Sequence, residues 1–406
     1  MSNYNASRNV LYDMDLLYPK EELAEIEKKR QEISIGIPNE SSKLENRVAL
    51  TPESVNVLSA SGCNVVIEAG AGDKSSFSDL DYLNAGATIS KSRREVYGAD
   101  VVLQVSPFTS QEIDLLRGMQ LVISSLLISG QTQENIKKMM SKKITALCFE
   151  HIKDVKNCNY IVRSMSEIAG SAVIMLGGKY LSKDEGGKGI IIGNVTGVSP
   201  SEVVILGAGT VAENAAKLAL AMGSKVQVFD KSLYRLNRLT QIIGKQIYTS
   251  VFHPPTLTKA LSSADLIIGA LRRDDEDNNF VVSSEMTKNI KKGSVVIDLS
   301  IDQGGTFESS KLTNHKKPTF VKEGVLYYCV PNVPSIVPRT ASIALSNVLL
   351  PLLNEFILMP NAKNFIKLNS GVRSGVYIYN GILTNSTLGH VVGIDYKDIN
   401  LLLAAL

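Results

Sequence analysis

The sequence predicts an α/β protein with two Rossmann-like, doubly wound parallel-sheet domains that are separated by a cleft and joined by long helices. Two series of short β-branched runs alternate with helical patterns, which is typical of parallel sheets. The chain has 406 residues. That length exceeds one ordinary core and favours two domains of roughly 150 to 200 residues each. An extension over residues 1–32, ending in a charge spacing typical of a short exposed helix, precedes the first series.

The first series of strands reads "ISIGIP", "NVVIEAG", "DVVLQVS", "LVISSLL" and "KITALCF". A long helical pattern, "NYIVRSMSEIAGSAVIMLGGKYLS", and the loop "KDEGGKG" separate it from the second series, "EVVILGAGT", "KVQVFD", "QIYTSVF", "ADLIIGAL", "GSVVIDLS" and "VLYYCVPNVP". After Pro338 the pattern becomes helical, and too few residues remain for a third domain. We therefore expect residues 33–160 plus 340–406 to form one domain and residues 161–339 the other.

Composition narrows the class of protein. A hydrophobic fraction of 44%, a charged fraction of 20% and a net charge of +3 predict a soluble globular chain without the basic stripe of nucleic-acid binders. No apolar run approaches the length of about 20 residues that a membrane span needs, and no signal peptide is evident. The four cysteines form no C-x-x-C pair, so we expect no metal site and a cytoplasmic location.

The most specific local motif is "VVILGAGTVAENAAKLALAMGSKVQVFD". In it a strand meets a glycine turn that opens a helix, where one glycine permits the tight turn, the next lets the backbone approach a pyrophosphate, and the helix N-terminus supplies amides. The alternative is a strand-to-helix turn that needs glycine for its backbone conformation and binds no nucleotide. Here, however, the turn lies in a complete βαβ frame. The predicted dinucleotide contacts at this turn are Gly207, Ala208, Gly209, Thr210 and Val211.

Asp230 ends the second strand of this frame. An acid there accepts hydrogen bonds from ribose hydroxyls and repels a 2′-phosphate, so NAD is the expected cofactor. Arg235 follows as a further candidate contact, with an exposed charged helix face as the alternative. Ala270 and Leu271 follow another strand end and are expected to line the cofactor, and the run "RRDDEDNN" after them is expected to be a solvated loop.

Arg47 stands between a strand and the start of a helix at Thr51 and Pro52, a good cap and first-turn pair. An arginine so placed can bind a carboxylate with two parallel hydrogen bonds. The alternative is a surface arginine that pairs with Glu45 or Glu53.

Asp302 follows the strand "VVIDLS". Ligands of open α/β sheets bind beyond the C-terminal ends of strands, which favours Asp302 over Asp298 within the strand. The alternative for Asp302 is a turn acid before Gly304 and Gly305.

Six motifs occur in the same order as in the alanine dehydrogenases: "ENRVALTP", "SDLDYLNAGA", "MSEIAG", "GAGTVAENAAKLALAMG", "SIDQGGTFE" and "NVPSIVPRTASIALSN". The chain resembles that family from about residue 33 to near its end. The family shares a fold with the NAD-binding subunit of proton-translocating transhydrogenases, and "IDQGG" with "VPRT" resembles alanine dehydrogenase more. The resemblance implies NAD as cofactor, a small amino or oxo acid as substrate, and a homo-hexamer.

The resemblance also implies roles for single residues. Arg47 is assigned to the substrate carboxylate, Asn332 and Val333 to the nicotinamide and substrate, and Ser166 to the cofactor. Asp302 matches the acidic residue of the catalytic centre. A carboxylate there makes chemical sense, because hydride leaves the α-carbon as an iminium forms and water then adds.

Two positions depart from the family. Gln104 stands where a lysine helps to hold the substrate carboxylate, and Leu126 where a histidine moves a proton. None of the four histidines is a clean substitute, although His151 follows a strand end. Two functions therefore stay open: an NAD-dependent enzyme that converts L-alanine, NAD and water to pyruvate, ammonia and NADH, with altered or weak activity, or an NAD(H)-binding paralogue or transhydrogenase-like subunit without that activity.

Overall fold

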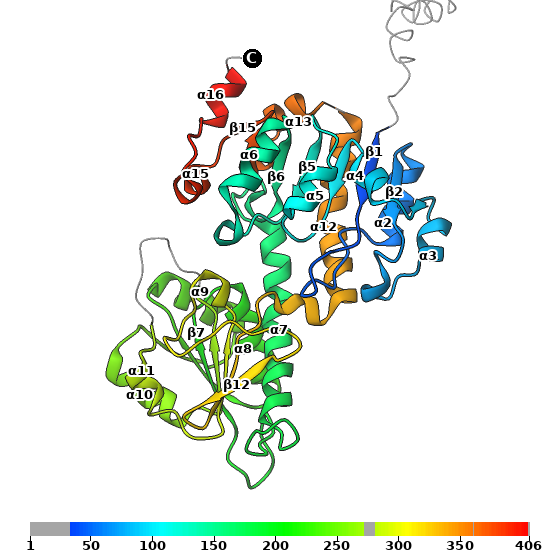
Figure 1. Cartoon of the computed structure of the whole chain (residues 1–406). Helices are drawn as coiled ribbons and strands as arrows, with labels where there is room; N and C mark the ends of the chain where they lie inside the picture. Colours follow the sequence, from blue (N-terminus) through cyan, green and yellow to red (C-terminus); the bar gives the residue numbers. More distant parts are fainter. Residues whose placement is uncertain (1–32, 272–280, 360, 405–406) are drawn as a thin grey trace, which may run out of the picture.

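The computed structural model describes residues 33–271, 281–359 and 361–404. The helix expected at the end of the N-terminal extension and the loop "RRDDEDNN" lie outside these residues. The described chain forms two lobes, each with a sheet and helices, and the two are joined by α7 (Tyr160–Leu181) and α12 (Pro338–Leu358), which lie side by side in Figure 1. The expected α/β class with two units and long connecting helices is confirmed.

The first sheet has eight strands in the order β15-β14-β6-β5-β4-β1-β2-β3. They are β1 (Ser34–Ile37), β2 (Asn64–Glu68), β3 (Thr88–Ser90), β4 (Val101–Leu103), β5 (Leu121–Ser124), β6 (Thr145–Cys148), β14 (Val376–Tyr379) and β15 (Ile382–Leu383). The strands from β6 to β3 are parallel, and most of their residues are buried apolar ones, as a sheet covered on both faces requires. β14 runs antiparallel to β6, so this edge departs from the purely parallel prediction.

The second sheet has seven strands in the order β12-β13-β11-β10-β7-β8-β9. They are β7 (Glu202–Leu206), β8 (Lys225–Phe229), β9 (Tyr248–Ser250), β10 (Leu266–Gly269), β11 (Val295–Asp298), β12 (Thr319–Lys322) and β13 (Val325–Tyr328). The register pairs Gly269 with both Leu206 and Asp298, so three central strands end level at one edge. Only β12 is antiparallel in this sheet, and the sequence did not predict it.

The remaining helices cover the sheets or connect the strands. In the first lobe they include α2 (Pro52–Ala60), α3 (Asp79–Asn84), α4 (Arg93–Tyr97), α5 (Ser110–Leu115), α6 (Gln133–Ser141), α13 (Ala362–Leu368), α14 (Ser370–Arg373), α15 (Ser386–Val392) and α16 (Ile399–Ala404). In the second lobe they are α8 (Thr210–Ala221), α9 (Leu233–Ile243), α10 (Pro254–Ser263) and α11 (Ser284–Thr287). Short 3-10 turns follow several strands, among them η4 (Phe149–His151), η5 (Ile301–Gln303) and η6 (Val333–Ile336).

The helix α7 belongs to both lobes. Near its start Ile161 packs in the core of the first lobe, and further along Ala172 and Val173 pack in the core of the second. At Gly170 the helix approaches α8 so closely that a Cβ atom there would lie 2.4 Å from the carbonyl oxygen of Val211. This glycine contact fixes the first turn of α8 against the connecting helix.

The helix α12 also joins the lobes, and by length and composition alone it could cross a membrane. The expectation that no apolar run reaches that length is therefore wrong for this helix. Its buried side chains pack against α2 and α7, however, as in a core helix. Thr51 precedes α2 as predicted, but its hydroxyl lies 3.3 Å from that of Ser346 on α12 and does not cap α2.

Candidate active site

The glycine turn after β7 forms a cradle at the C-terminal edge of the second sheet. Gly207 has φ 114°, and a Cβ atom there would lie 2.4 Å from the carbonyl oxygen of Ala270. Beside Gly209, by contrast, an added Cβ would meet no described atom within 4 Å. The turn therefore offers open backbone at the start of α8, which fits a pyrophosphate. The fold brings together here the predicted residues Gly207, Ala208, Gly209, Thr210, Val211, Ala270 and Leu271.

Asp230 lies at the end of β8 and is only 1% exposed. One carboxylate oxygen accepts a hydrogen bond from the amide of Ala208 at 2.7 Å, and the other accepts one from the amide of Ser232 at 2.8 Å. The acid thus orders the glycine turn itself. Each oxygen has a further lone pair that a ribose hydroxyl can use.

Two other predicted cofactor contacts lie nearby in the fold. Arg235 is exposed in the first turn of α9, where its amide donates to the hydroxyl of Ser232. Ser166 is partly buried on α7, one turn before the Gly170 contact with α8. Ser166 is therefore on the side of α7 that approaches the nucleotide cradle.

The Arg47 side chain is buried and paired. Its Nε and Nη2 donate to the two carboxylate oxygens of Glu45, both at 2.7 Å, and Nη1 lies 3.3 Å from the sulfur of Met165. The predicted alternative was right about Glu45 as partner, but wrong about the surface, because Arg47 is 9% exposed. Burial opposes the charge of Arg47, yet the carboxylates of Glu45, Glu40 and Glu150 raise its pKa.

The backbone around Arg47 is held by hydroxyl groups from the far end of the chain. The amides of Asn46, Val48 and Thr51 donate to the hydroxyls of Ser335, Ser342 and Ser346 at 2.8, 2.9 and 3.0 Å. Ser342 and Ser346 lie one turn apart on α12, and Ser335 precedes this helix. The interdomain helix therefore sets the position of the Arg47 loop, a role that sequence reasoning missed.

Asn332 connects the lobes. It has φ 61°, and its amide nitrogen donates to Glu45 at 2.6 Å across 287 residues of sequence. Glu45 thus receives hydrogen bonds from both predicted substrate-binding residues, Arg47 and Asn332. The neighbouring Val333 is buried in the second core, so its backbone is the part that can reach a ligand.

Asp298, the last residue of β11, and Asp302, beyond it in η5, have different environments. Asp298 is fully buried, and its carboxylate accepts hydrogen bonds from the amides of Ser300 and Thr306 and from the hydroxyl of Ser310. Asp302 is exposed on η5. Desolvation, and after it the charges of Glu150 and Asp298, nevertheless raise the pKa of Asp302. This arrangement gives Asp298 a structural role and leaves Asp302 accessible to a ligand.

Gln104 is engaged within the first lobe and is 2% exposed. It accepts a hydrogen bond from the hydroxyl of Tyr97 at 3.0 Å and donates one to the carbonyl oxygen of Ser106 at 2.9 Å. Leu126 is buried in the core of the same lobe. The next residue, Leu127, is 43% exposed with φ 40°, so the outward-facing side chain beyond β5 is Leu127 and not Leu126.

Glu40 is a functional candidate that sequence reasoning missed. Its two carboxylate oxygens accept the amides of Val105 and Ser106 at 2.5 and 3.1 Å, directly after Gln104. Burial is the main cause that raises its pKa to about 7. The only sequence signal was an acid in the polar loop after the first strand.

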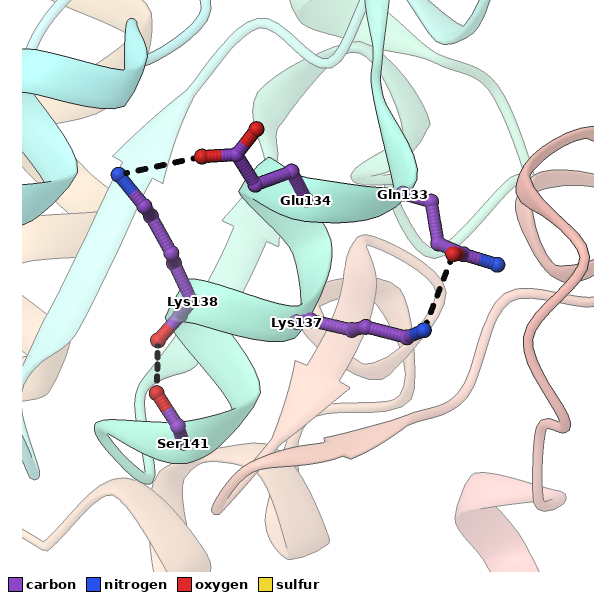
Figure 2. A pocket seen from close by; sticks show the side chains of 5 residues that line it. All are labelled: Gln133, Glu134, Lys137, Lys138 and Ser141. Carbon is purple, nitrogen blue, oxygen red and sulfur yellow. Dashed lines mark hydrogen bonds and ion pairs between the residues drawn. The ribbon is translucent and has the colours of Figure 1, made fainter.

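Two further observations concern features that do not contribute to the candidate site. An open hollow on α6, lined by Gln133, Glu134, Lys137, Lys138 and Ser141, is a solvated helix face with its own ion pair and hydrogen bonds (Figure 2). None of the residues that line it is a candidate site residue named above. Among the described residues, no group of three His, Cys, Asp or Glu side chains could hold a metal ion.

Comparison with known proteins shows the family to which this chain belongs. Two family models match the chain: "Alanine dehydrogenase/PNT, N-terminal domain" over residues 36–169 and "Alanine dehydrogenase/PNT, C-terminal domain" over residues 172–386. The alanine dehydrogenase of Methanococcus maripaludis is 37% identical over 364 residues, which cover 89% of this chain and 97% of that protein. Alanine dehydrogenase 2 of Staphylococcus aureus is 35% identical over 372 residues, covering 90% and 98%.

Solved structures match the same span. An L-alanine dehydrogenase superposes with a TM-score of 0.83 at 32% identity and covers 89% of this chain and 99% of that chain. A transhydrogenase from Sinorhizobium meliloti superposes with a TM-score of 0.74 at 23% identity, covering 88% and 100%. The second likeness concerns the fold alone.

Proposed function

This chain belongs to the alanine dehydrogenase/PNT family, and from that premise we propose that it is an NAD-dependent alanine dehydrogenase. The reaction converts L-alanine, NAD and water to pyruvate, ammonia and NADH. The observation that carries the proposal is the hydrogen-bonded series Arg47, Glu45 and Asn332, which joins a carboxylate-binding arginine of one lobe to the nucleotide-binding lobe.

The cofactor residues proposed are those of the cradle. Open backbone at Gly209 and the start of α8 would hold the pyrophosphate, and Asp230 the adenosine ribose. Ser166, Arg235, Ala270, Leu271 and Val333 complete the proposed contacts. When bound, the nicotinamide ring accepts the hydride of the substrate α-carbon.

Arg47 binds the substrate carboxylate. Glu45 occupies the edge of the guanidinium formed by Nε and Nη2, so the substrate meets Nη1 and the outer hydrogen of Nη2. The Arg47–Glu45 pair is electrically neutral, and Gln104 adds no charge. We therefore expect weak binding of the substrate carboxylate and a high KM for small oxo acids.

Asp302 acts at the amino group and the attacking water. Its exposed carboxylate stabilises the iminium that forms as the hydride leaves, and it takes the proton of the water that adds to the iminium carbon. Its raised pKa makes this carboxylate a stronger proton acceptor than an ordinary aspartate.

The second candidate function is an NAD(H)-binding paralogue without this activity. It is favoured by one observation, the engagement of Gln104 with Tyr97 and Ser106 inside the first lobe. A nicotinamide absorbance assay with L-alanine and NAD, and with pyruvate, ammonium and NADH, separates the two. Turnover supports the dehydrogenase, and tight NADH binding without turnover supports the paralogue.

The proposal also covers the roles of the two domains and the oligomeric state. Residues 33–160 plus 340–406 form the substrate domain, residues 161–339 the NAD-binding domain, and the enzyme is a cytoplasmic homo-hexamer. The family resemblance supports the hexamer, and light scattering of the purified protein at assay concentration tests it. A monomer in solution would contradict it.

A further inference from the structure

Glu150 lies at the C-terminal edge of the first sheet, in η4 directly after β6. One oxygen of its carboxylate, Oε2, accepts a hydrogen bond from the amide of Leu126 at 3.0 Å and one from the thiol of Cys148 at 3.2 Å. Its carbonyl oxygen accepts one from the amide side chain of Asn159 at 2.8 Å. The carboxylate is thus fixed in direction while its residue stays partly exposed.

The charge of Glu150 acts on both lobes. It contributes to the raised pKa of Arg47 in its own lobe, and it contributes, after burial, to the raised pKa of Asp302 in the other. Two other titratable groups feel the same charge, the Cys148 thiol and the Tyr377 hydroxyl, whose pKa values are raised mainly by burial. These charge effects support a place for Glu150 between Arg47 and Asp302, and the hydrogen bond from the Leu126 amide sets its carboxylate beside Leu127, the outward-facing side chain beyond β5.

We propose that Glu150 is a further catalytic residue of the dehydrogenase reaction, acting with Asp302 as a second carboxylate at the substrate amino group. This inference rests on the proposed function. Within the described part of the chain, both hydrogen bonds to the Glu150 carboxylate end on Oε2, and we assign Oε1 to the substrate. The exposed neighbour Leu127 has no ionisable group, and the Glu150 carboxylate is a proton acceptor next to it.

The proton steps balance with two carboxylates. Glu150 first takes a proton from the substrate ammonium, which leaves a neutral amine. The Cα–H bond then breaks, its electron pair and hydrogen leave together as hydride, and the C=N bond of a cationic iminium forms. Water adds to the carbon and gives a proton to Asp302. Asp302 passes this proton to solvent. The C–N bond breaks last: the proton on Glu150 returns to the nitrogen, which leaves as ammonia, while the hydroxyl group on the carbon gives its proton to Asp302 and the C=O bond of pyruvate forms.

Replacement of Glu150 by glutamine tests the charge without removing the acceptor. The side chain of Glu150→Gln keeps an oxygen for the Leu126 amide, so the melting temperature should stay unchanged. We expect kcat/KM for L-alanine to fall about 100-fold and one limb of its pH profile to disappear. Glu150→Asp should restore part of the rate and the limb. Glu134→Gln on the solvated face of α6 is the matched control and should behave as wild type.

A second measurement does not depend on turnover. Pyruvate is titrated into the NADH complex of the whole protein, with NADH fluorescence as the readout. If Glu150 faces the substrate, Glu150→Gln removes a like charge and should tighten pyruvate binding about tenfold. Unchanged affinity together with an unchanged pH profile would overturn the assignment. A wild type without turnover would instead contradict the proposed function, and the titration would still decide whether Glu150 faces the ligand.

Discussion

Glu45 holds Arg47 through two parallel hydrogen bonds of 2.7 Å, with the pair buried at the boundary of the two lobes. Burial opposes ionisation of Glu45, but the charge and hydrogen bonds of Arg47 lower its pKa below the usual 4.5. Asn332 donates to the same carboxylate from the other lobe. The arginine proposed to bind the substrate is therefore positioned by Glu45, which also accepts a hydrogen bond from Asn332 of the second lobe.

Replacement of Arg47 by alanine leaves Glu45 buried without its counter-charge. Breaking such a pair costs about 3–5 kcal/mol, so we expect the free energy of unfolding at pH 7 to fall by about that amount in Arg47→Ala. Because the pKa of Glu45 is lowered in the fold, the pair stabilises above pH 4.5, and this contribution is lost as the pH falls below it. Urea unfolding at neutral and acid pH checks this, and a difference that does not shrink in acid would contradict it.

Asp302 and Asp298 form a matched pair for mutation to asparagine. Asp302 is exposed, so Asp302→Asn should leave the melting temperature unchanged while kcat falls by about 100-fold or more. Asp298→Asn removes a fully buried carboxylate with several hydrogen-bond donors and should cost about 2 kcal/mol of stability or more. Thermal unfolding and steady-state rates on both variants decide. The opposite pattern would assign catalysis to Asp298.

The two glycines of the nucleotide turn should respond differently to an added methyl group. Gly207→Ala forces φ 114° on alanine and a contact of 2.4 Å with the backbone of Ala270, so we expect loss of stability. Gly209→Ala meets no described atom, and the protein should fold normally. Its Cβ instead occupies the space proposed for the pyrophosphate, so the Kd for NADH should rise about tenfold or more. Normal NADH binding by Gly209→Ala would contradict the placement of the cofactor.

Leu126 occupies a core position and Leu127 an outward-facing one, so mutations at the two sites should have different effects. Leu126→His places an imidazole in the buried core of the first lobe and should destabilise the protein by about 2 kcal/mol or more without any gain in rate. Position 127 is exposed, so Leu127→His should be tolerated, and it should raise kcat for L-alanine about tenfold or more. A gain in rate from Leu126→His instead would contradict the structural choice between the two.

Much of the fold and the nucleotide turn could be predicted because the signals are local. The β-branched runs at β7, β10 and β11 give a parallel sheet with level ends, and that geometry brings Ala270 beside Gly207 as expected. The position of Asp302 beyond β11 follows from the same rule. The strand, turn and helix of the nucleotide motif lie within about 30 residues of sequence, the span of one βαβ unit.

The missed features depend on contacts between distant residues. Nothing near Glu45 predicts its bond with Asn332, and nothing near Arg47 predicts that Ser342 and Ser346 hold its loop from α12. The edge strand β12 has no fully buried residue and β15 has only two residues, so neither carries the buried apolar run by which the other strands are recognised. The shift from Leu126 to Leu127 depends on a single residue of register, which only the packed core determines.

The most direct test of the account is the nicotinamide absorbance assay on the wild-type protein and on Asp302→Asn, with a panel of amino and oxo acids. We predict measurable turnover of L-alanine with NAD, and of pyruvate and ammonium with NADH, that the variant lacks while it still binds NADH. Tight NADH binding by the wild type, with no turnover above blank for any substrate of the panel, would contradict the dehydrogenase and support the paralogue.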